Sequence, residues 1–329
     1  VGSSSYNMRV LLLMTLLAGT EAFAPTHSKP RQAFALRPAA SPPLRPLHVL
    51  RGGTVQSSLA GVLSGAMAVP AASGIAAVAC SLCYIRQAYV FSLSYGLAMA
   101  GIGGAVLLTS PASALVTAHA ALVAAYGARL FSFLFWRQRF QPGYDGAAKL
   151  KALDKTPRLQ RTPIVLSTGL FYGLMSSPLL FHLQAAPLAG LAARVSGLGC
   201  ALAAFGVAYE ALADQQKSLY KMGLRAAGKE DELYMGGVWA SSRHANYFGE
   251  LAFWSGSYLA GLPALLAAGV PLYVRALKAC ASGLGLAGIF FIMLSATKRL
   301  EGKYEDKYRT SQRYDEYFAS SNALVPKVF

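Results

Sequence analysis

Acidic residues are scarce in this sequence, and charged residues of either sign are few. Asp and Glu number 14 against 30 Lys and Arg in 329 residues, so 13% of the chain is charged, whereas soluble domains carry about a quarter. No Asp or Glu occurs between Glu21 and Asp145. Hydrophobic residues make up 54%, and the mean hydropathy is +0.40. This composition excludes an ordinary soluble domain and indicates a surface that contacts lipid.

Cysteines are also few, and their placement fits neither a metal site nor a disulfide framework. The four cysteines (Cys80, Cys83, Cys200 and Cys280) lie inside apolar stretches. Cys80 and Cys83 have the C-x-x-C spacing, but no second pair accompanies them as in a zinc site. We therefore expect no metal ligands.

The net charge of +16 is distributed as in a membrane protein. Lys and Arg gather in short segments between apolar stretches and do not alternate with aromatic residues on one face. Membrane proteins show this pattern because basic residues collect in the connections on one side of the bilayer. The charge therefore argues against a nucleic-acid partner and favours the lipid bilayer.

Apolar stretches of about 20 residues, the length that spans a bilayer, recur after residue 53. Seven are expected: Leu59–Cys80, Tyr89–Thr109, Ser113–Trp136, Pro163–Leu183, Leu188–Ala208, Tyr247–Ala268 and Ala279–Ala296. They predict an all-α fold, a polytopic bundle of six or seven transmembrane helices. Alternation along the chain would place the polar segments 137–162, 209–246 and 298–329 on one side of the membrane.

The N-terminal segment has the composition of an organelle address. After Met8 and Arg9 comes a short apolar run from Val10 to Leu17, typical of a secretory signal and too short to span a bilayer. The stretch that follows is basic and free of acid, and it opens with Ala22-Phe23-Ala24-Pro25. This arrangement resembles the bipartite leaders of algae with complex plastids. We expect a leader over residues 1–53, a membrane domain over 54–329 and a plastid membrane location. The alternative is a secretory leader and the endoplasmic reticulum membrane.

One polar constellation is expected where the fifth apolar stretch ends. Glu210, Asp214 and Lys217 stand at i, i+4 and i+7, so they share one helical face. Ionisable residues at a membrane boundary are costly unless paired or hydrated, which makes them functional candidates. The alternative is a simple Asp214–Lys217 ion pair on a solvated helix end.

A second constellation opens the sixth apolar stretch. Arg243, Asn246, Tyr247 and Glu250 again share one face, beside His244, and Ser242 is expected to cap the helix. Arginine and histidine at a helix N-terminus suit a phosphate, because free N–H groups point outward there. The alternative is an interfacial cluster in which Glu250 pairs with Arg243.

These residues carry a family resemblance. The run Arg243-His244-Ala245-Asn246-Tyr247-Phe248-Gly249-Glu250 resembles the R-H-P-N-Y-F-G-E signature of the DUF1295 branch of the steroid 5α-reductase-like membrane proteins, with Ala245 in place of proline. The run Glu210 to Lys217, Arg129, the pair Tyr314 and Tyr317, and Leu324-Val325-Pro326 resemble further motifs of that branch. The resemblance covers about residues 120–329.

The resemblance implies an NADPH site between the C-terminal helices. It assigns cofactor contacts to Asp214, Asn246 and Glu250, and the motifs add Glu210, Lys217, Arg243, His244 and Tyr247. In the steroid branch a hydride goes to an enone while a tyrosine with a carboxylate polarises the carbonyl. The carboxylate of an early helix is missing here. Tyr84, Tyr89, Tyr95 and Tyr126 are candidate tyrosines, and the sequence does not select one.

Three functions remain open from the sequence. The first is an NAD(P)H-dependent membrane reductase of a lipophilic unsaturated substrate such as a sterol, isoprenoid or pigment precursor. The second is a membrane methyltransferase of the isoprenylcysteine type, which binds S-adenosylmethionine. The third is a non-enzymatic subunit of a plastid membrane complex.

Overall fold

In a computed structural model, the structure describes residues 52–111, 113–141, 151, 154–229, 232–267, 269–309 and 312–327. The chain divides into two compact units, residues 1–56 and 57–329, and the helical bundle lies in the second. The predicted leader therefore falls almost entirely outside the described residues and stays a prediction.

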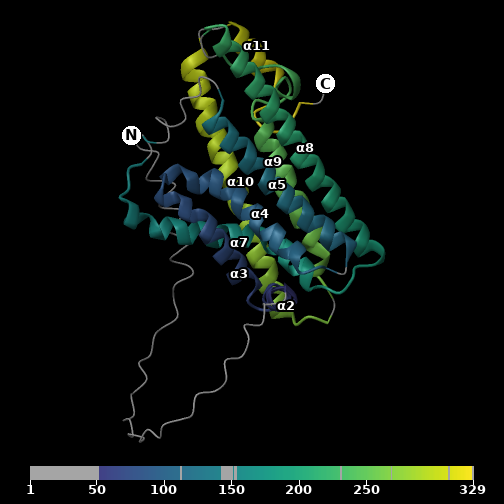
Figure 1. Ribbon diagram of the computed structural model, residues 1–329. Coiled ribbons are helices and arrows are strands. Elements are labelled where there is room, and N and C mark those ends of the chain that lie inside the picture. Colours follow the sequence, from purple (N-terminus) through teal and green to yellow (C-terminus); the bar gives the residue numbers. More distant parts are fainter. Residues whose placement is uncertain are drawn as a thin grey trace, which may run out of the picture. The chain divides into compact units, whose positions relative to one another are not determined.

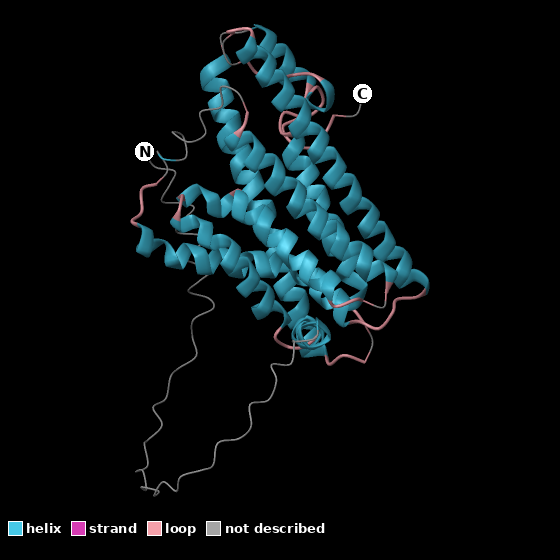
Figure 2. Ribbon diagram, in the orientation of Figure 1, coloured by secondary structure: helices cyan, strands magenta, loops and turns pink. Residues whose placement is uncertain are grey.

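The described residues form helices and connecting loops, which confirms the predicted all-α fold (Figures 1 and 2). The α-helices are α2 (Gly52–Leu63), α3 (Ala68–Cys80), α4 (Leu93–Leu108), α5 (Ala114–Arg139), α7 (Thr162–Gln184), α8 (Gly190–Ala226), α9 (Ala245–Leu265), α10 (Leu272–Tyr308) and α11 (Gln312–Ser320). Short 3-10 turns join them: η1 (Ser81–Tyr84), η2 (Gln87–Phe91), η3 (Arg158–Arg161) and η4 (Gly237–Trp239).

Four helical segments are long and apolar enough to cross a membrane: Ala114–Arg139, Arg158–Gln184, Gly190–Ala226 and Leu272–Tyr308. A fifth exists if α2 and α3, which bend by 114° at their junction, count as one span. The remaining two predicted spans correspond to α4, an apolar helix of 16 residues, and α9, whose surface is mostly enclosed by its neighbours. The protein is a polytopic helical membrane protein.

Two helices extend well beyond the predicted spans. The stretch Leu188–Ala208 continues as α8 to Ala226, and Ala279–Ala296 lies within the 37-residue α10. At 1.5 Å per residue each helix is about 55 Å long, against a hydrocarbon core of about 30 Å. The polar run from Glu210 to Lys217, expected to share one helical face at the end of the fifth stretch, lies within α8, which continues to Ala226. A span predicted from hydropathy ends at the first charged residues. The helix itself can continue, because Glu, Gln and Lys are good helix formers.

Glycines bring α8 and α9 into close backbone contact. A Cβ placed on Gly249 of α9 would lie 2.6 Å from the backbone nitrogen of Glu210 on α8, and Gly206 of α8 faces the backbone of Phe253 in the same way. Small residues allow this approach in membrane helices. The contact sets Glu210 beside the turn of α9 that carries Glu250.

The bundle interior is formed by α3, α4, α5, α7 and α9, with α8 and α10 alongside (Figure 1). Fully buried side chains include Met99, Tyr126, Leu179 and Phe253. Large apolar side chains such as Leu198, Leu212 and Phe291 instead point outward and are about half exposed or more. These outward faces are the surfaces that contact lipid.

Outside the bundle, Asp154 ties two connections together. Its carboxylate accepts a hydrogen bond of 2.7 Å from the backbone N–H of Gln87 and one of 3.0 Å from Arg86, and it lies 3.4 Å from Arg161. The backbone bond to Gln87 and the two guanidinium groups hold the pKa of Asp154 below its ordinary value. This carboxylate therefore stays ionised and anchors the segment that leads into α7.

Candidate functional site

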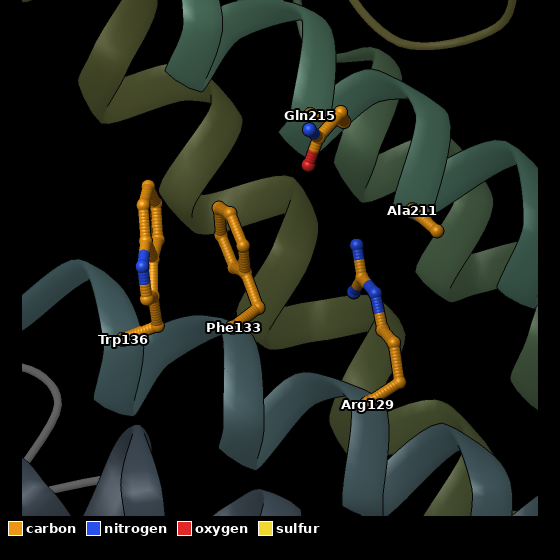
Figure 3. A pocket seen from close by; sticks show the side chains of 5 residues that line it. All are labelled: Arg129, Phe133, Trp136, Ala211 and Gln215. Carbon is orange, nitrogen blue, oxygen red and sulfur yellow. The ribbon is translucent and has the colours of Figure 1, made fainter. Parts of the chain in front are cut away.

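Arg129 of α5 bridges the two carboxylates of the first predicted constellation. Its Nη1 donates to Glu210 Oε1 at 2.8 Å and its Nη2 donates to Asp214 Oδ2 at 2.6 Å. Glu210 and Asp214 are one helical turn apart on α8, so one planar guanidinium reaches both. Figure 3 shows the Arg129 side chain extending from α5 toward α8. Asp214 is therefore bound by a cation from another helix and is not part of a simple ion pair on a solvated helix end.

Only one of the two carboxylate oxygens of Glu210 takes part in this bridge. Glu210 is 3% exposed, and its second oxygen, Oε2, is buried with no hydrogen-bond partner. A buried carboxylate oxygen without a donor is costly. It is therefore a candidate acceptor for a hydroxyl or amide of a bound molecule.

Glu250 belongs to a hydrogen-bond network formed with aromatic side chains. The hydroxyl of Tyr95 (α4) donates to Glu250 Oε1 at 2.8 Å. Trp254 Nε1, one turn along α9, donates to the Tyr95 hydroxyl oxygen at 2.5 Å, and Tyr126 (α5) donates to the same oxygen at 3.2 Å. The Phe253 ring stacks on Tyr126 with centroids 4.0 Å apart. Tyr95 thus has a carboxylate partner from a late helix, where the sequence offered none from an early one.

Arg243 and His244 contact a different carboxylate, Glu301 of α10. Arg243 donates from Nε at 2.8 Å and from Nη2 at 2.6 Å to Glu301 Oε2, and His244 Nε2 lies 2.8 Å from Oε1. Arg243 is 5% exposed and His244 is 2% exposed. The expected alternative, a pair between Arg243 and Glu250, is wrong because Arg243 is held by Glu301.

The end of α11 and the segment after it cover this second cluster. Arg243 Nη1 donates to the carbonyl of Ser321 at 2.5 Å, and its guanidinium lies 3.9 Å from the centre of the Phe318 ring. Ser242 donates to the carbonyl of Leu324 at 2.6 Å and does not cap α9; the N-cap is His244, without a side-chain cap. The expected cap was wrong because the C-terminal segment takes the Ser242 hydroxyl.

The remaining predicted residues lie between and around these clusters. Asn246 is partly exposed, and its side chain makes no hydrogen bond to any residue that the structure describes. The Tyr247 ring stacks on His244 with centroids 5.5 Å apart. The Lys217 ammonium lies 4.0 Å from the centre of the Trp239 ring. Asn246 therefore offers free donors and an acceptor at the start of α9.

The predicted set thus forms two clusters and not one pocket. Glu210 and Asp214 share Arg129, and Gly249 beside Glu210 brings Glu250 into the same part of the interior. Arg243, His244 and Tyr247 belong to the Glu301 cluster. The predicted cofactor contacts of these residues stay predictions, and Arg243 and His244 would have to release Glu301 to make them.

A third buried cluster was not anticipated from the sequence. His119 Nδ1 of α5 and His182 Nδ1 of α7 lie 3.3 Å apart. His119 Nε2 is 2.8 Å from Ser257 of α9, and His182 Nε2 is 3.4 Å from Ser196 of α8. All four residues are at most 1% exposed. The sequence shows these two histidines only as isolated polar residues in apolar stretches. Their contacts could not be predicted, because helix packing brings the partners together.

An open cavity of about 390 Å³ lies between α5 and α8, next to the Arg129 bridge (Figure 3). Arg129, Phe133 and Trp136 line it from α5, and Ala211 and Gln215 line it from α8. Among the described residues, no group of three or more His, Cys, Asp and Glu side chains is placed to hold a metal ion.

Comparison with known proteins assigns the chain to a family. A family model described as "Protein of unknown function (DUF1295)" matches residues 91–321, well over half of the chain. The chain belongs to the DUF1295 family. No curated protein and no solved structure matches it.

The DUF1295 match confirms the family expected from the Arg243–Glu250 run. It begins at Phe91 in η2, just before α4, and extends just beyond α11. The Arg129 bridge, the Tyr95–Glu250 pair, the Glu301 cluster and the histidine cluster therefore all lie within the DUF1295 region. The family description assigns no activity to any of them.

Proposed function

We propose that this DUF1295 protein is a membrane-embedded NAD(P)H-dependent reductase of a lipophilic unsaturated substrate, such as a sterol, isoprenoid or pigment precursor. The pairing of Tyr95 with Glu250 carries the proposal. A buried tyrosine beside a carboxylate is a group that polarises a carbonyl and supplies a proton as an enone is reduced. Both residues are enclosed by apolar helices, where a lipophilic substrate would be reduced away from water.

The described residues fit the ribose and amide portions of a nicotinamide cofactor. The free Oε2 of Glu210 would accept a hydrogen bond from a ribose hydroxyl, and the Asn246 amide would pair with a carboxamide. Asp214 is held by Arg129 on the same face of α8 as Glu210. Arg243 and His244 would bind the cofactor phosphates if they released the carboxylate of Glu301. Lys217 on α8 is a further cation for this purpose.

Bound NAD(P)H would supply a hydride to the β-carbon of the conjugated substrate. Tyr126 is the hydroxyl that could turn toward a substrate oxygen, because its 3.2 Å hydrogen bond to Tyr95 is long for two hydroxyl groups. Tyr95 is fixed by Trp254 and Glu250. A proton would then return to Tyr126 from Tyr95, and to Tyr95 from Glu250 in its carboxylic acid form.

The test is NADPH oxidation by protein in nanodiscs, with a steroid 4-en-3-one as the first enone of a panel. Glu250→Gln and Tyr126→Phe should lower kcat at least about 100-fold, as general acid–base groups do. Tyr89→Phe, which removes a hydroxyl outside this network, should leave the rate unchanged. Equal rates in all four proteins would remove Tyr126 and Glu250 from the reaction.

A second candidate is an S-adenosylmethionine-dependent methyltransferase of the isoprenylcysteine type. The pair Arg243 and His244 already holds a carboxylate, that of Glu301, and the methionine part of S-adenosylmethionine carries the same group. The closed Glu301 cluster also suits a third candidate, a non-enzymatic subunit of a plastid membrane complex. Binding measurements with the two cofactors separate these candidates.

The proposed location is a plastid membrane, with the endoplasmic reticulum membrane as the alternative. The support is the Ala22-Phe23-Ala24-Pro25 motif and the basic stretch after it. A fluorescent fusion of residues 8–60 should reach the plastid in an alga with complex plastids, and Phe23→Ala should hold it outside. Delivery of the unaltered fusion to the cell surface would refute a plastid location.

A further inference from the structure

The start of α10 carries two cations that no acidic residue of the chain compensates. Arg275 and Lys278 stand three residues apart, so they share one face of the helix. The helices that pack on α10 are α7 and α9. No Asp or Glu occurs in residues 155–209, which include all of α7, or in residues 251–300, which include most of α9 and the first 29 residues of α10. The negative charge that balances this pair must therefore come from another molecule.

Both cations lie on the side of α10 that packs against α7. The Lys278 ammonium lies 5.0 Å from the centre of the Phe181 ring of α7. One turn after Lys278, Ser282 shares a hydrogen bond of 3.0 Å with Ser177 of α7. The Nε atom of Arg275 is buried and has no hydrogen-bond partner among the described residues. A buried N–H group without an acceptor is costly, so an acceptor at this end of the groove between α7 and α10 would stabilise the protein.

The pair lies at the level of the lipid headgroups. Lys278 directly precedes the apolar run Ala279–Ala296, whose 18 residues are about 27 Å long, close to the bilayer core thickness of about 30 Å. Leu272 and Tyr273, at the start of α10, are largely exposed, as expected of side chains at a membrane interface. Cations at this level meet the phosphate groups of the adjacent leaflet.

The helix itself adds to the positive potential. The N-terminal end of a helix carries a partial positive charge, which acidic residues in the first turn usually balance. The first turn of α10 contains no acidic residue. Arg275 and Lys278 instead add two full positive charges to this end, so the electrostatic energy favours a bound anion.

We propose that this end of the groove between α7 and α10 binds the headgroup of an anionic phospholipid. The phosphodiester lies between Arg275 and Lys278, and the acyl chains follow the outward face of α10, where Leu277 and Leu284 are exposed. Basic pockets between membrane helices bind anionic headgroups in this way. Glu301 is 26 residues beyond Arg275, about 39 Å along the same helix, so the lipid site is remote from the proposed cofactor residues and does not rest on the proposed function.

The experiment is photolabelling of the protein in nanodiscs with a phosphatidylglycerol that carries a diazirine close to its glycerol, followed by mapping of labelled peptides. Labelling is expected around residues 272–284. The double variant Arg275→Gln/Lys278→Gln should reduce this labelling at least about tenfold, because each cation near the surface favours an anionic lipid several-fold. Arg194→Gln, which removes an exposed cation near the start of α8 at the same end of the bundle, is the control and should not.

A phosphatidylcholine with the same diazirine serves as the zwitterionic probe, and it should label these residues at least about fivefold less. Inorganic phosphate at millimolar concentration should not compete with the anionic probe. Competition by phosphate would mean that the groove binds a free anion and would overturn the lipid proposal. Equal labelling by the two lipid probes would overturn the charge argument and the proposal with it. Equal labelling of the double variant and the Arg194→Gln protein would place the lipid elsewhere, with the same consequence.

Discussion

The hydroxyl of Tyr95 donates a hydrogen bond of 2.8 Å to the carboxylate of Glu250, although the two residues are 155 positions apart. Tyr95 lies near the start of α4, and Glu250 lies on the second turn of α9. The early helices contain no acid, so a tyrosine–carboxylate pair is assembled only when α9 enters the bundle. The hydrogen bond between Tyr95 and Glu250 therefore forms only if α9 is correctly packed against α4.

Arg129 should be the residue on which the carboxylates of α8 depend most. Arg129→Gln would remove the guanidinium that bridges Glu210 and Asp214, at a cost of about 3–5 kcal/mol for a broken buried pair. Arg129→Lys should recover only part of the lost stability, because an ammonium lacks the planar fork that reaches both carboxylates. Thermal unfolding in detergent would measure the difference. Arg139→Gln, on the exposed last turn of α5, is the control and should have little effect.

Gly206 should tolerate no side chain. Its Cβ position is filled by the backbone of Phe253, so Gly206→Ala should destabilise the bundle by about 1–3 kcal/mol. Gly197, on the same helix, has open space at its Cβ position, so Gly197→Ala should be neutral or slightly stabilising. Unfolding temperatures of the two variants would show this contrast. Equal losses would mean that helix α8 does not approach α9 closely at Gly206.

The helices were largely predictable from the sequence, because runs of apolar residues reveal them directly. The bend between α2 and α3 and the extension of α8 past Glu210 were not, since hydropathy reports burial and not helix continuity. Of the site, the sequence singled out the right residue types but not their partners. Arg129 was noted only by resemblance, and the partners of Tyr95 and Arg243 come from distant helices that spacing along one segment cannot identify.

The Arg243–Glu301 pair should hold the C-terminal segment in place. Arg243→Ala and Glu301→Ala should each destabilise the protein by about 3–5 kcal/mol, and the double variant should lose less than the sum. Release of the segment should speed tryptic cleavage at Arg313 in α11. Lys298→Ala, exposed one turn before Glu301, serves as the control. Strictly additive losses with no change in cleavage would mean that the pair does not fasten the segment.

Binding of NADPH to the protein in nanodiscs, measured by thermal shift beside S-adenosylmethionine, tests the proposed reductase most directly. We predict that NADPH alone binds and that Asn246→Ala weakens its binding about ten- to a hundred-fold, the loss expected for a hydrogen bond worth roughly 1.5–3 kcal/mol. Arg275→Ala, on the first turn of α10 outside these clusters, should bind as the unaltered protein does. Binding of S-adenosylmethionine in place of NADPH, lost in the same Asn246 variant, would contradict the reductase and support the methyltransferase.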